Sequence, residues 1–558
     1  MRLTILFLIA LALPAQVFHA ETGQPVTAEN PAIPGERLTM AAVDGLHDES
    51  ELYLAGNPVF WAWSGDSQIE FTLPENAAGS FYEANIENFV ATIPVNRADG
   101  IQLDGAEVDN LVRSAAAAVD DQRLVVAVVD RTGRPLAIYK RPLASDGDVE
   151  DALSLARTGA FFSHNQAPLS SRTVRSISTI NFPEGIPNQP AAALYGIENT
   201  NRGCSFNTTF LPGKFIPRAQ NADETGPSRG IATRAGGLPI YRNGSIMVGG
   251  IGVGGVAPDV AEFATVAATF GTPFFVGLPL PPPQAVYIDG FRLPFVTQTT
   301  QPDGTSPGSR TDGAYVRPEY PLHGNEVPEG WLVGPKAGPT LTEAEVRSII
   351  ERTLDRANRT RAVIRLPLGT RAKFVIAVTD LNGDILGLFR MTDSTIFSID
   401  VAVAKARNVV YFSGPNVDPR DLGDDPSERV PVGTAFTNRT IGFGAQPFFP
   451  SGILNSRPGP FFGVYQFDLA NPCTQGRQPK NDFQSGIVFF PGSAPLYKGG
   501  NMVGGLGVSG DGVEQDDYAT AGGIVGFEAP DNLRSDTDDR MIRGVRLPYL
   551  KFPRNPEQ

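Results

Sequence analysis

Two glycine-rich blocks, 255 residues apart, constrain this sequence more than any other feature. One is GGIGVGG at 249–255 and the other is GGLGVSG at 504–510, so glycines recur at four matched places. A short strand-like run precedes each block, and a plausible helix start follows it, with EFAT at 262–265 matching DYAT at 517–520. Self-similarity at so long a period indicates duplicated structural units and therefore decides the domain count.

The duplication extends well beyond the glycines. VVAVVD at 125–130 matches VIAVTD at 375–380 with an offset of 250, and RTV at 172–174 matches RTI at 439–441 with an offset of 267. The difference of 17 means that the second copy holds 17 additional residues between these blocks. Other matched pairs are Ala156-Arg157 with Ala406-Arg407, Phe162-Ser163 with Phe412-Ser413, and GFRLPF at 290–295 with GVRLPY at 544–549. So many blocks in one order indicate two homologous modules.

Each module shows the same order of local signals. Asp104-x-x-Glu107 and Thr342-x-x-Glu345 resemble capping boxes in front of helical apolar spacing. Two strands joined by a tight turn follow, and Asn382-Gly383 is a hairpin signal because both positions tolerate positive φ. A second helix is predicted over Val149–Phe162 and Ile399–Phe412. A strand, a glycine-rich turn and a third helix close each module.

These patterns divide the chain into five parts. Residues 1–20 contain one early arginine, an apolar run and then small residues, which is typical of a secretory signal peptide too short to span a bilayer. Residues 21–100 form a small, mostly β N-terminal region. Module one covers 101–296, a linker rich in Gly and Pro covers 297–340, and module two covers 341–550. We therefore expect a periplasmic or secreted protein without a transmembrane segment.

The overall charge excludes one class of partner. The formal net charge is -14, and a nucleic-acid surface needs clustered lysine and arginine to neutralise phosphates. We expect no nucleic-acid partner and attribute the charge chiefly to solubility.

The chain contains two cysteines, Cys204 and Cys473, which lie in corresponding parts of the two modules. Export makes a disulfide chemically feasible. A bridge between the modules and two separate buried thiols are both compatible with the sequence, since the spacing alone does not show whether the two Cβ atoms approach each other.

Module two contains the blocks VIAVTDLNGDILGLFRM at 375–391, SIDVAVAKARNVVYF at 398–412 and NMVGGLGVSGDGVEQDDYA at 501–519. These three blocks resemble the GlcG/HbpS family of haem-binding or haem-degrading domains, and module one is similar to a divergent copy. The resemblance implies an α/β (α+β) domain in which helices cover an antiparallel sheet. It also implies pairing of domains, which two copies in one chain would supply as an intrachain pseudo-dimer, with a larger oligomer as a further option. It implies haem, or a related anionic planar small molecule, as the ligand.

The glycine-rich blocks and the acidic residues behind them allow two interpretations each. A phosphate cradle is disfavoured, because the spacing is not G-x-G-x-x-G and carboxylates would repel phosphate; close backbone packing is the better interpretation. The carboxylates of Asp511, Glu514, Asp516 and Asp517 form a candidate cation site. Acidic residues are also favoured at a helix N-terminus by the helix dipole alone.

Three residues are candidates for haem contact. His164 is the only histidine within a matched block, and its counterpart in module two is Gly414, so a symmetric pair of histidine-ligated haems is excluded. Arg157 and Arg407 are candidate partners for a propionate or another anion, because guanidinium pairs well with carboxylate. A helix-end histidine and structural ion pairs are the alternative interpretations.

The sequence therefore supports two hypotheses of different kinds. The first is an exported protein that binds haem or a similar ligand. The second is an extracytoplasmic scaffold or interaction protein whose duplicated domains have lost their ligand, which the scarcity of histidine favours. An enzyme is a weaker third option, because the sequence contains no Ser-His-Asp or Cys-His arrangement and no zinc spacing.

Overall fold

The computed structural model divides into two compact units, residues 1–99 with 391–393, and residues 100–390 with 394–558. The residues that it describes are 13–20, 23–27, 32, 36–41, 45–54, 57–73, 81–87, 89–94, 103–179, 194–204, 206, 230–242, 246–276, 285–288, 291–316, 329–366, 368–450, 453 and 455–557. Within these residues, no helix combines the length and the apolar character that crossing a membrane requires.

The first unit is built from strands in its described residues, as the sequence predicted. Its two sheets have the orders β1-β9-β8-β4-β5 and β2-β3-β7-β6. The strands are β1 (Leu13–Pro14), β2 (Gln16–His19), β3 (Arg37–Ala41), β4 (Leu52–Leu54), β5 (Asn57–Val59), β6 (Trp61–Gly65), β7 (Gln68–Thr72), β8 (Phe81–Ile86) and β9 (Phe89–Pro94). Val17 and His19 of β2 are buried. Removal of residues 1–20 as a signal peptide would therefore take β1 and β2 from these sheets.

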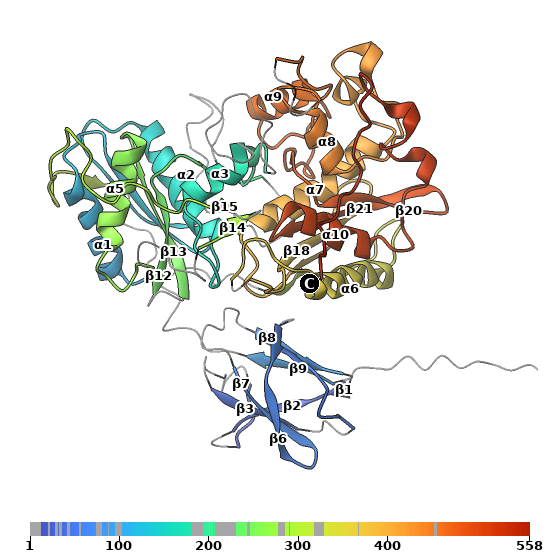
Figure 1. Ribbon diagram of the computed structural model, residues 1–558, viewed down its shortest axis with the longest axis horizontal. Helices are drawn as coiled ribbons and strands as arrows, with labels where there is room; N and C mark the ends of the chain where they lie inside the picture. Colours follow the sequence, from blue (N-terminus) through green and yellow to red (C-terminus); the bar gives the residue numbers. More distant parts are fainter. Residues whose placement is uncertain are drawn as a thin grey trace, which may run out of the picture. The chain divides into compact units, whose positions relative to one another are not determined.

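Module one contains a five-stranded antiparallel sheet in the order β12-β13-β10-β11-β16. Its helices α1, α2 and α5 cover the sheet (Figure 1). The elements are α1 (Gly105–Ala118), β10 (Val125–Asp130), β11 (Pro135–Lys140), α2 (Asp146–Phe162), α3 (Ser171–Thr179), β12 (Gly237–Arg242), β13 (Ile246–Gly254), α5 (Pro258–Thr269), β14 (Tyr287–Ile288), β15 (Phe291–Arg292) and β16 (Ala314–Tyr315). The predicted capping box of Asp104 and Glu107 is present at the start of α1.

Module two repeats this arrangement, with its sheet in the order β17-β19-β18-β21-β20. The elements are β17 (Gly330–Val333), α6 (Glu343–Arg359), β18 (Phe374–Thr379), β19 (Ile385–Arg390), α7 (Phe397–Ser413), α8 (Asn438–Gly444), α9 (Phe462–Ala470), β20 (Ser493–Lys498), β21 (Asn501–Gly510) and α10 (Val513–Gly523). The capping box of Thr342 and Glu345 begins α6 as predicted. The two modules thus confirm the expected fold class, in which helices cover an antiparallel sheet.

Both faces of the module-one sheet are buried, which explains the continuous apolar run of β10. Val125, Ala127 and Val129 belong to the core beneath α2. Val126 and Val128 point to the opposite face and pack with apolar residues of α1 and α5. Because side chains alternate along a strand, a strand covered on both faces has to be apolar at every position.

The glycine-rich blocks lie within strands β13 and β21, so the expectation of a glycine-rich turn there was wrong. The expectation of close backbone packing is confirmed. A Cβ atom on Gly250 would collide with the carbonyl oxygen of Ala156 in α2, and one on Gly505 would collide with that of Ala406 in α7. These glycines allow a helix backbone to lie directly on the sheet.

The segment predicted as a linker contributes a strand to each module. β16 pairs with β11 at the edge of the first sheet, and β17 pairs with β19 at the edge of the second. Residues 297–340 are therefore partly integrated into the folds on either side of them. The prediction missed these strands because each is only two to four residues long and gives little periodic signal.

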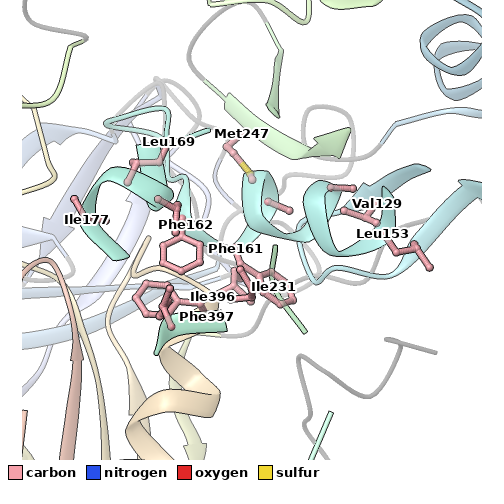
Figure 2. Packing of buried hydrophobic residues seen from close by; sticks show 14 of the residues in the cluster. Val129, Leu153, Phe161, Phe162, Leu169, Ile177, Ile231, Met247, Ile396 and Phe397 are labelled. Atoms are coloured by element: carbon pink, nitrogen blue, oxygen red, sulfur yellow. The ribbon is translucent and has the colours of Figure 1, made fainter. Parts of the chain in front are cut away.

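The two modules pack against one another within the second unit and share an apolar core. Figure 2 shows Phe161 and Phe162 at the end of α2 beside Ile396 and Phe397 at the start of α7. The rings of Phe162 and Phe397 are stacked, with centroids 4.1 Å apart. Stacked, buried aromatic rings bring a large apolar area out of water at one place in the interface. This is the intrachain pairing of modules that the family resemblance implied.

Candidate functional site

His164 lies just after α2, and both of its ring nitrogens are engaged in the interface between the modules. Nδ1 accepts hydrogen bonds of 3.2 Å from the backbone N–H groups of Gln166 and Ala167. Nε2 lies 3.0 Å from the carbonyl oxygen of Ile364 in module two, and because Nδ1 is an acceptor, Nε2–H is the donor. The side chain is fully buried. His164 therefore acts as a hydrogen-bonded connection between the modules.

Arg157 and Arg407 occupy equivalent positions in α2 and α7. The Nε–H of Arg157 lies 3.4 Å from the carbonyl oxygen of Gly133, and that of Arg407 donates to the carbonyl oxygen of Gly383 at 2.9 Å. Gly133 and Gly383 belong to the hairpin turns between the first two strands of each module. Both arginine residues are 0% exposed. Each arginine therefore fastens a helix to a turn of its own module.

Arg407 also makes contacts across the interface. Its Nη2 donates to the carbonyl oxygen of Phe206 in module one at 3.2 Å, and within module two its Nη1 donates to the hydroxyl of Ser485. Burial lowers the pKa of Arg407 to about 10, although the nearby carboxylates of Asp384 and Asp380 act in the opposite direction. The guanidinium remains charged at neutral pH, and the protein groups around it supply its hydrogen-bond acceptors.

The four carboxylates proposed as a cation site each pair with a basic side chain. Asp511 pairs with Arg365, Asp516 with Lys405, Asp517 with Arg439 and Glu514 with Lys551. Among the described residues, no group of three or more His, Cys, Asp or Glu side chains is arranged to hold a metal ion. Each of the four carboxylates is instead paired with a basic side chain from a separate segment.

The Lys405–Asp516 pair is an unusual feature of the module-two core. Nζ of Lys405 lies 2.9 Å from the Asp516 carboxylate and donates to the carbonyl oxygen of Val508 at 2.8 Å, and Lys405 is 0% exposed. Burial raises the pKa of Asp516 to about 7 and lowers the pKa of Lys405. In module one the matched positions are Leu155 and Ala261, so the same place there is apolar.

A second ion pair is present in both modules and was not predicted. Arg172 in α3 binds Glu262 in α5 at 2.8 Å, and Arg439 in α8 binds Asp517 in α10. Both acidic partners are buried. The sequence could have predicted this ion pair. The RTV and RTI blocks each begin with an arginine, and the EFAT and DYAT blocks each begin with an acidic residue, so both copies keep opposite charges at matched positions.

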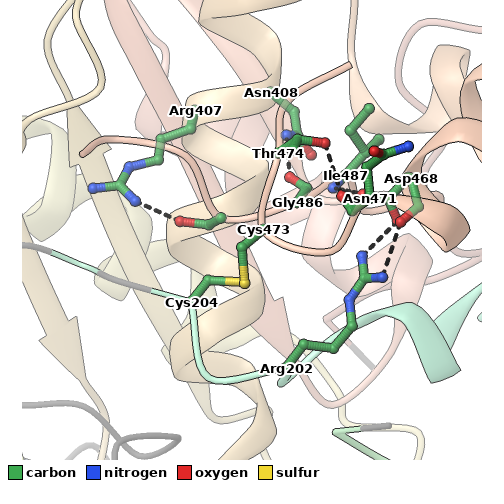
Figure 3. Close-up of a disulfide and its surroundings, with 11 residues drawn as sticks. Arg202, Cys204, Arg407, Asn408, Asp468, Asn471, Cys473, Thr474, Gly486 and Ile487 are labelled. Carbon is green, nitrogen blue, oxygen red and sulfur yellow. Dashed lines mark hydrogen bonds and ion pairs between the residues drawn. A yellow bond between two sulfur atoms is a disulfide. The ribbon is translucent and has the colours of Figure 1, made fainter. Parts of the chain in front are cut away.

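The two cysteines form a disulfide that joins the modules. Cys204 and Cys473 have their Cα atoms 5.2 Å apart, and 269 residues separate them in the sequence. The bridge between modules is therefore confirmed over the alternative of two separate thiols. Next to it, the guanidinium of Arg202 binds the carboxylate of Asp468 at 2.7 Å, with both side chains almost fully buried (Figure 3).

The residues chosen from sequence do not fit haem. Haem iron takes an axial side-chain ligand, and its propionates pair with accessible cations. His164 would have to break its hydrogen bonds with Ile364 or with the backbone to bind iron. Arg157 and Arg407 are buried against backbone carbonyl groups of the hairpin turns. All three residues are instead part of the folded interface and its supporting turns.

Comparison with solved structures gives matches of low identity. The PduOC–haem complex is 19% identical over 34% of this chain and 97% of that chain, with a TM-score of 0.23. The Klebsiella pneumoniae protein ORFY is 20% identical over 35% of this chain and 96% of that chain, with a TM-score of 0.22. A double mutant of Streptomyces reticuli HbpS is 20% identical over 30% of this chain and 84% of that chain, with a TM-score of 0.16.

The curated proteins include no significant match to the chain. The family comparison is more informative, because one model, described as haem degrading protein HbpS-like, matches twice. It covers residues 104–269 and 341–524, which together make up more than half of the 558 residues. The two matches coincide with the two modules of the structure. The chain therefore belongs to the HbpS-like family of haem-degrading proteins and contains two copies of the family's domain.

Proposed function

We propose that this protein is an exported binder of haem or of a related anionic planar small molecule. The observation that carries the proposal is the double match to the HbpS-like family, which makes a haem-type ligand the first expectation for each module. One of the matched solved structures is a complex of PduOC with haem, so the same ligand is named for that protein. Membership of a fold family gives the ligand class, whereas the residues that hold the ligand have to be argued separately.

Three residues that the sequence suggested as haem contacts are not part of the proposed binding surface. His164, Arg157 and Arg407 are engaged inside the second unit, so a bound haem would be held by other groups of the modules. When bound, haem would supply an iron centre and a strong visible absorption band. The protein would supply an apolar surface for the ring and cations for its propionates.

Titration of haemin into the purified protein tests the proposal. A saturable Soret shift is expected, and the variant His164→Ala should give the same shift and midpoint as the wild type. A flat or non-saturating response would remove haem from consideration. A Soret shift that disappears only in His164→Ala, with the fold retained by circular dichroism, would overturn our placement of the site away from His164.

The second candidate function is an extracytoplasmic scaffold that holds no ligand. It is favoured by the contacts that His164 and Arg407 make between the modules, together with the Cys204–Cys473 bridge and the Arg202–Asp468 ion pair. On this view the duplicated domain supplies a rigid pair of modules for binding another protein. The haemin titration separates the two candidates, because the scaffold predicts no saturable shift.

Export is a separate part of the proposal and rests on the composition of residues 1–20. Mass spectrometry of the protein recovered from the periplasm or the medium would test it. A mature N-terminus near residue 21 is expected. Recovery of the intact chain from the cytoplasm alone would contradict export and would keep β1 and β2 in the sheets of the first unit.

A larger assembly is also part of the proposal, because the two modules already form a pair within one chain. Sedimentation of the purified protein would measure its mass in solution. A single species at the mass of one chain, 59.6 kDa before processing, would contradict assembly beyond the intrachain pair.

A further inference from the structure

Module one contains an open polar depression at the start of helices α2 and α5. Its cavity volume is about 410 Å³, which is in the range of small-molecule sites. The residues that line it are Asp121, Arg123, Asp148, Asp151, Arg234, Gly255, Val256 and Ala257. None of these residues is one of the three candidates for haem contact, His164, Arg157 and Arg407.

The charges in this depression do not balance. Arg123 binds Asp148 at 2.8 Å, and the guanidinium of Arg234 binds the carboxylate of Asp151. The remaining carboxylate, Asp121, accepts a hydrogen bond from the backbone N–H of Arg123 but pairs with no cation among the described residues. The lining therefore carries one negative charge in excess, located on Asp121.

Module two has a corresponding surface. The residues that form it can be identified by comparing the neighbours of Gly255 with those of Gly510, the last glycines of the two blocks. A Cβ on Gly255 would meet the carbonyl oxygen of Arg123, and a Cβ on Gly510 would meet that of Lys373. The strand registers agree, because Val125 pairs with Gly254 and Val375 pairs with Ser509. Residues 255–257 and Arg123 in module one thus correspond to residues 510–512 and Lys373 in module two.

In module two this counterpart is filled by an arginine of the chain itself. The guanidinium of Arg365 binds the Asp511 carboxylate, and both side chains are fully buried. The backbone N–H of Val363 donates to the carbonyl oxygen of Asp511 at 2.9 Å. Arg365 comes from the segment that connects α6 to β18, which is fourteen residues long (360–373). The corresponding segment of module one, between α1 and β10, has six residues (119–124). Module one has no segment of that length there, and its surface stays open.

We propose that the depression of module one binds a small molecule with a guanidinium head group. The Asp121 carboxylate is the counter-ion of that group. It accepts from the backbone N–H of Arg123 as the Asp511 carboxylate accepts from the backbone N–H of Lys373, although the residue that aligns with Asp511 in sequence is Val256. A planar guanidinium presents two N–H groups to one carboxylate, so the arrangement selects it over a simple ammonium ion. The exposed guanidinium of Arg123, whose side chain is 60% exposed, adds a place for a carboxylate on the same ligand.

Calorimetric titration of the full-length protein with agmatine and with arginine tests this site. Saturable binding at one ligand per chain is expected, and Asp121→Asn should weaken the affinity for agmatine at least fivefold. Asp120→Asn is the matched control, because Asp120 is the neighbouring residue, carries the same charge and does not line the depression. Its affinity should equal that of the wild type.

A second variant is needed because Asp121→Asn could weaken binding by changing the local turn rather than by removing the charge. Val256→Trp should fill the depression and abolish agmatine binding, while circular dichroism and the melting temperature report an intact fold. The proposal is overturned if agmatine gives no saturable heat at millimolar concentration. It is equally overturned if both variants bind like the wild type.

Discussion

At the scale of single residues, His164 shows how a candidate ligand becomes a structural residue. Its ring accepts two backbone N–H groups and donates to the carbonyl oxygen of Ile364 in the other module. His164→Ala removes the acceptor and the donor together, so the N–H of Gln166 and the carbonyl oxygen of Ile364 lose their bonds to the ring, while the N–H of Ala167 keeps its bond to the backbone carbonyl oxygen of residue 164. We expect it to lower the free energy of unfolding by about 2–4 kcal/mol. Urea unfolding measures this change, and a variant as stable as the wild type would show that the interface does not depend on His164.

Asp400, in the first turn of α7, gives a prediction about pH. Burial raises its pKa to about 7, although a hydrogen bond with Asn201 acts in the opposite direction. The folded state therefore holds a proton that the unfolded chain releases near pH 4, and this residue makes stability fall as pH rises from about 4 to about 7. Asp400→Asn removes that penalty. We expect it to raise the free energy of unfolding by about 1–3 kcal/mol at pH 8, with the gain vanishing toward pH 4.

Thermal unfolding of Asp400→Asn and the wild type at several pH values measures this difference. The control is Asp146→Asn, since Asp146 lies in the first turn of α2 with its side chain 75% exposed. That variant should stay within about 0.5 kcal/mol of the wild type. A gain for Asp400→Asn that does not change with pH would mean that Asp400 does not hold a proton in the folded protein.

At the scale of elements, the contact between a helix and a glycine strand is the repeated structural feature of the modules. Gly505 in β21 faces the backbone of α7 so closely that a Cβ would overlap the carbonyl oxygen of Ala406. Gly505→Ala has to push the helix away from the sheet. We expect a loss of about 2–4 kcal/mol in the free energy of unfolding, because the backbone of both elements is buried and tightly packed.

Denaturant unfolding of Gly505→Ala compares it with Gly334→Ala. A Cβ on Gly334 would meet nothing within 4 Å, and its backbone is not in the left-handed region, so that variant should be neutral or slightly stabilising. Equal stabilities of the two variants would contradict the close packing of α7 on β21.

At the scale of the whole molecule, the disulfide fixes two modules that also share an apolar core. Cys204 and Cys473 are 269 residues apart, so reduction or Cys204→Ser releases a long loop in the unfolded chain. We expect a loss of about 2–5 kcal/mol in the free energy of unfolding. The fold should be retained, because the stacked Phe162 and Phe397 and their neighbours still hold the interface.

Thermal unfolding of the wild type with and without reductant measures the loss of stability, and the difference between the two conditions should vanish in Cys204→Ser. A reductant effect that persists in this variant would exclude the disulfide as its source.

The repeated architecture could be predicted from local patterns in the sequence. Matched blocks, capping boxes at Asp104 and Thr342 and the hairpin signal at Asn382-Gly383 each act within a few residues of their position. The first helix, the hairpin strands, the second helix and the helix after the glycine block could therefore be predicted for both modules. The glycine blocks were assigned to turns because their role depends on a helix that lies about 100 residues away in the sequence.

The roles of the chemically suggestive residues depend instead on tertiary contacts. His164, Arg157 and Arg407 are plausible ligand residues by type, but the fold buries each of them and gives each at least one hydrogen bond to a backbone group. The carboxylates near α10 are close in sequence, yet they point to partners from separate segments. Burial and the direction of a side chain are set by contacts between distant parts of the chain, which residue type and spacing do not record.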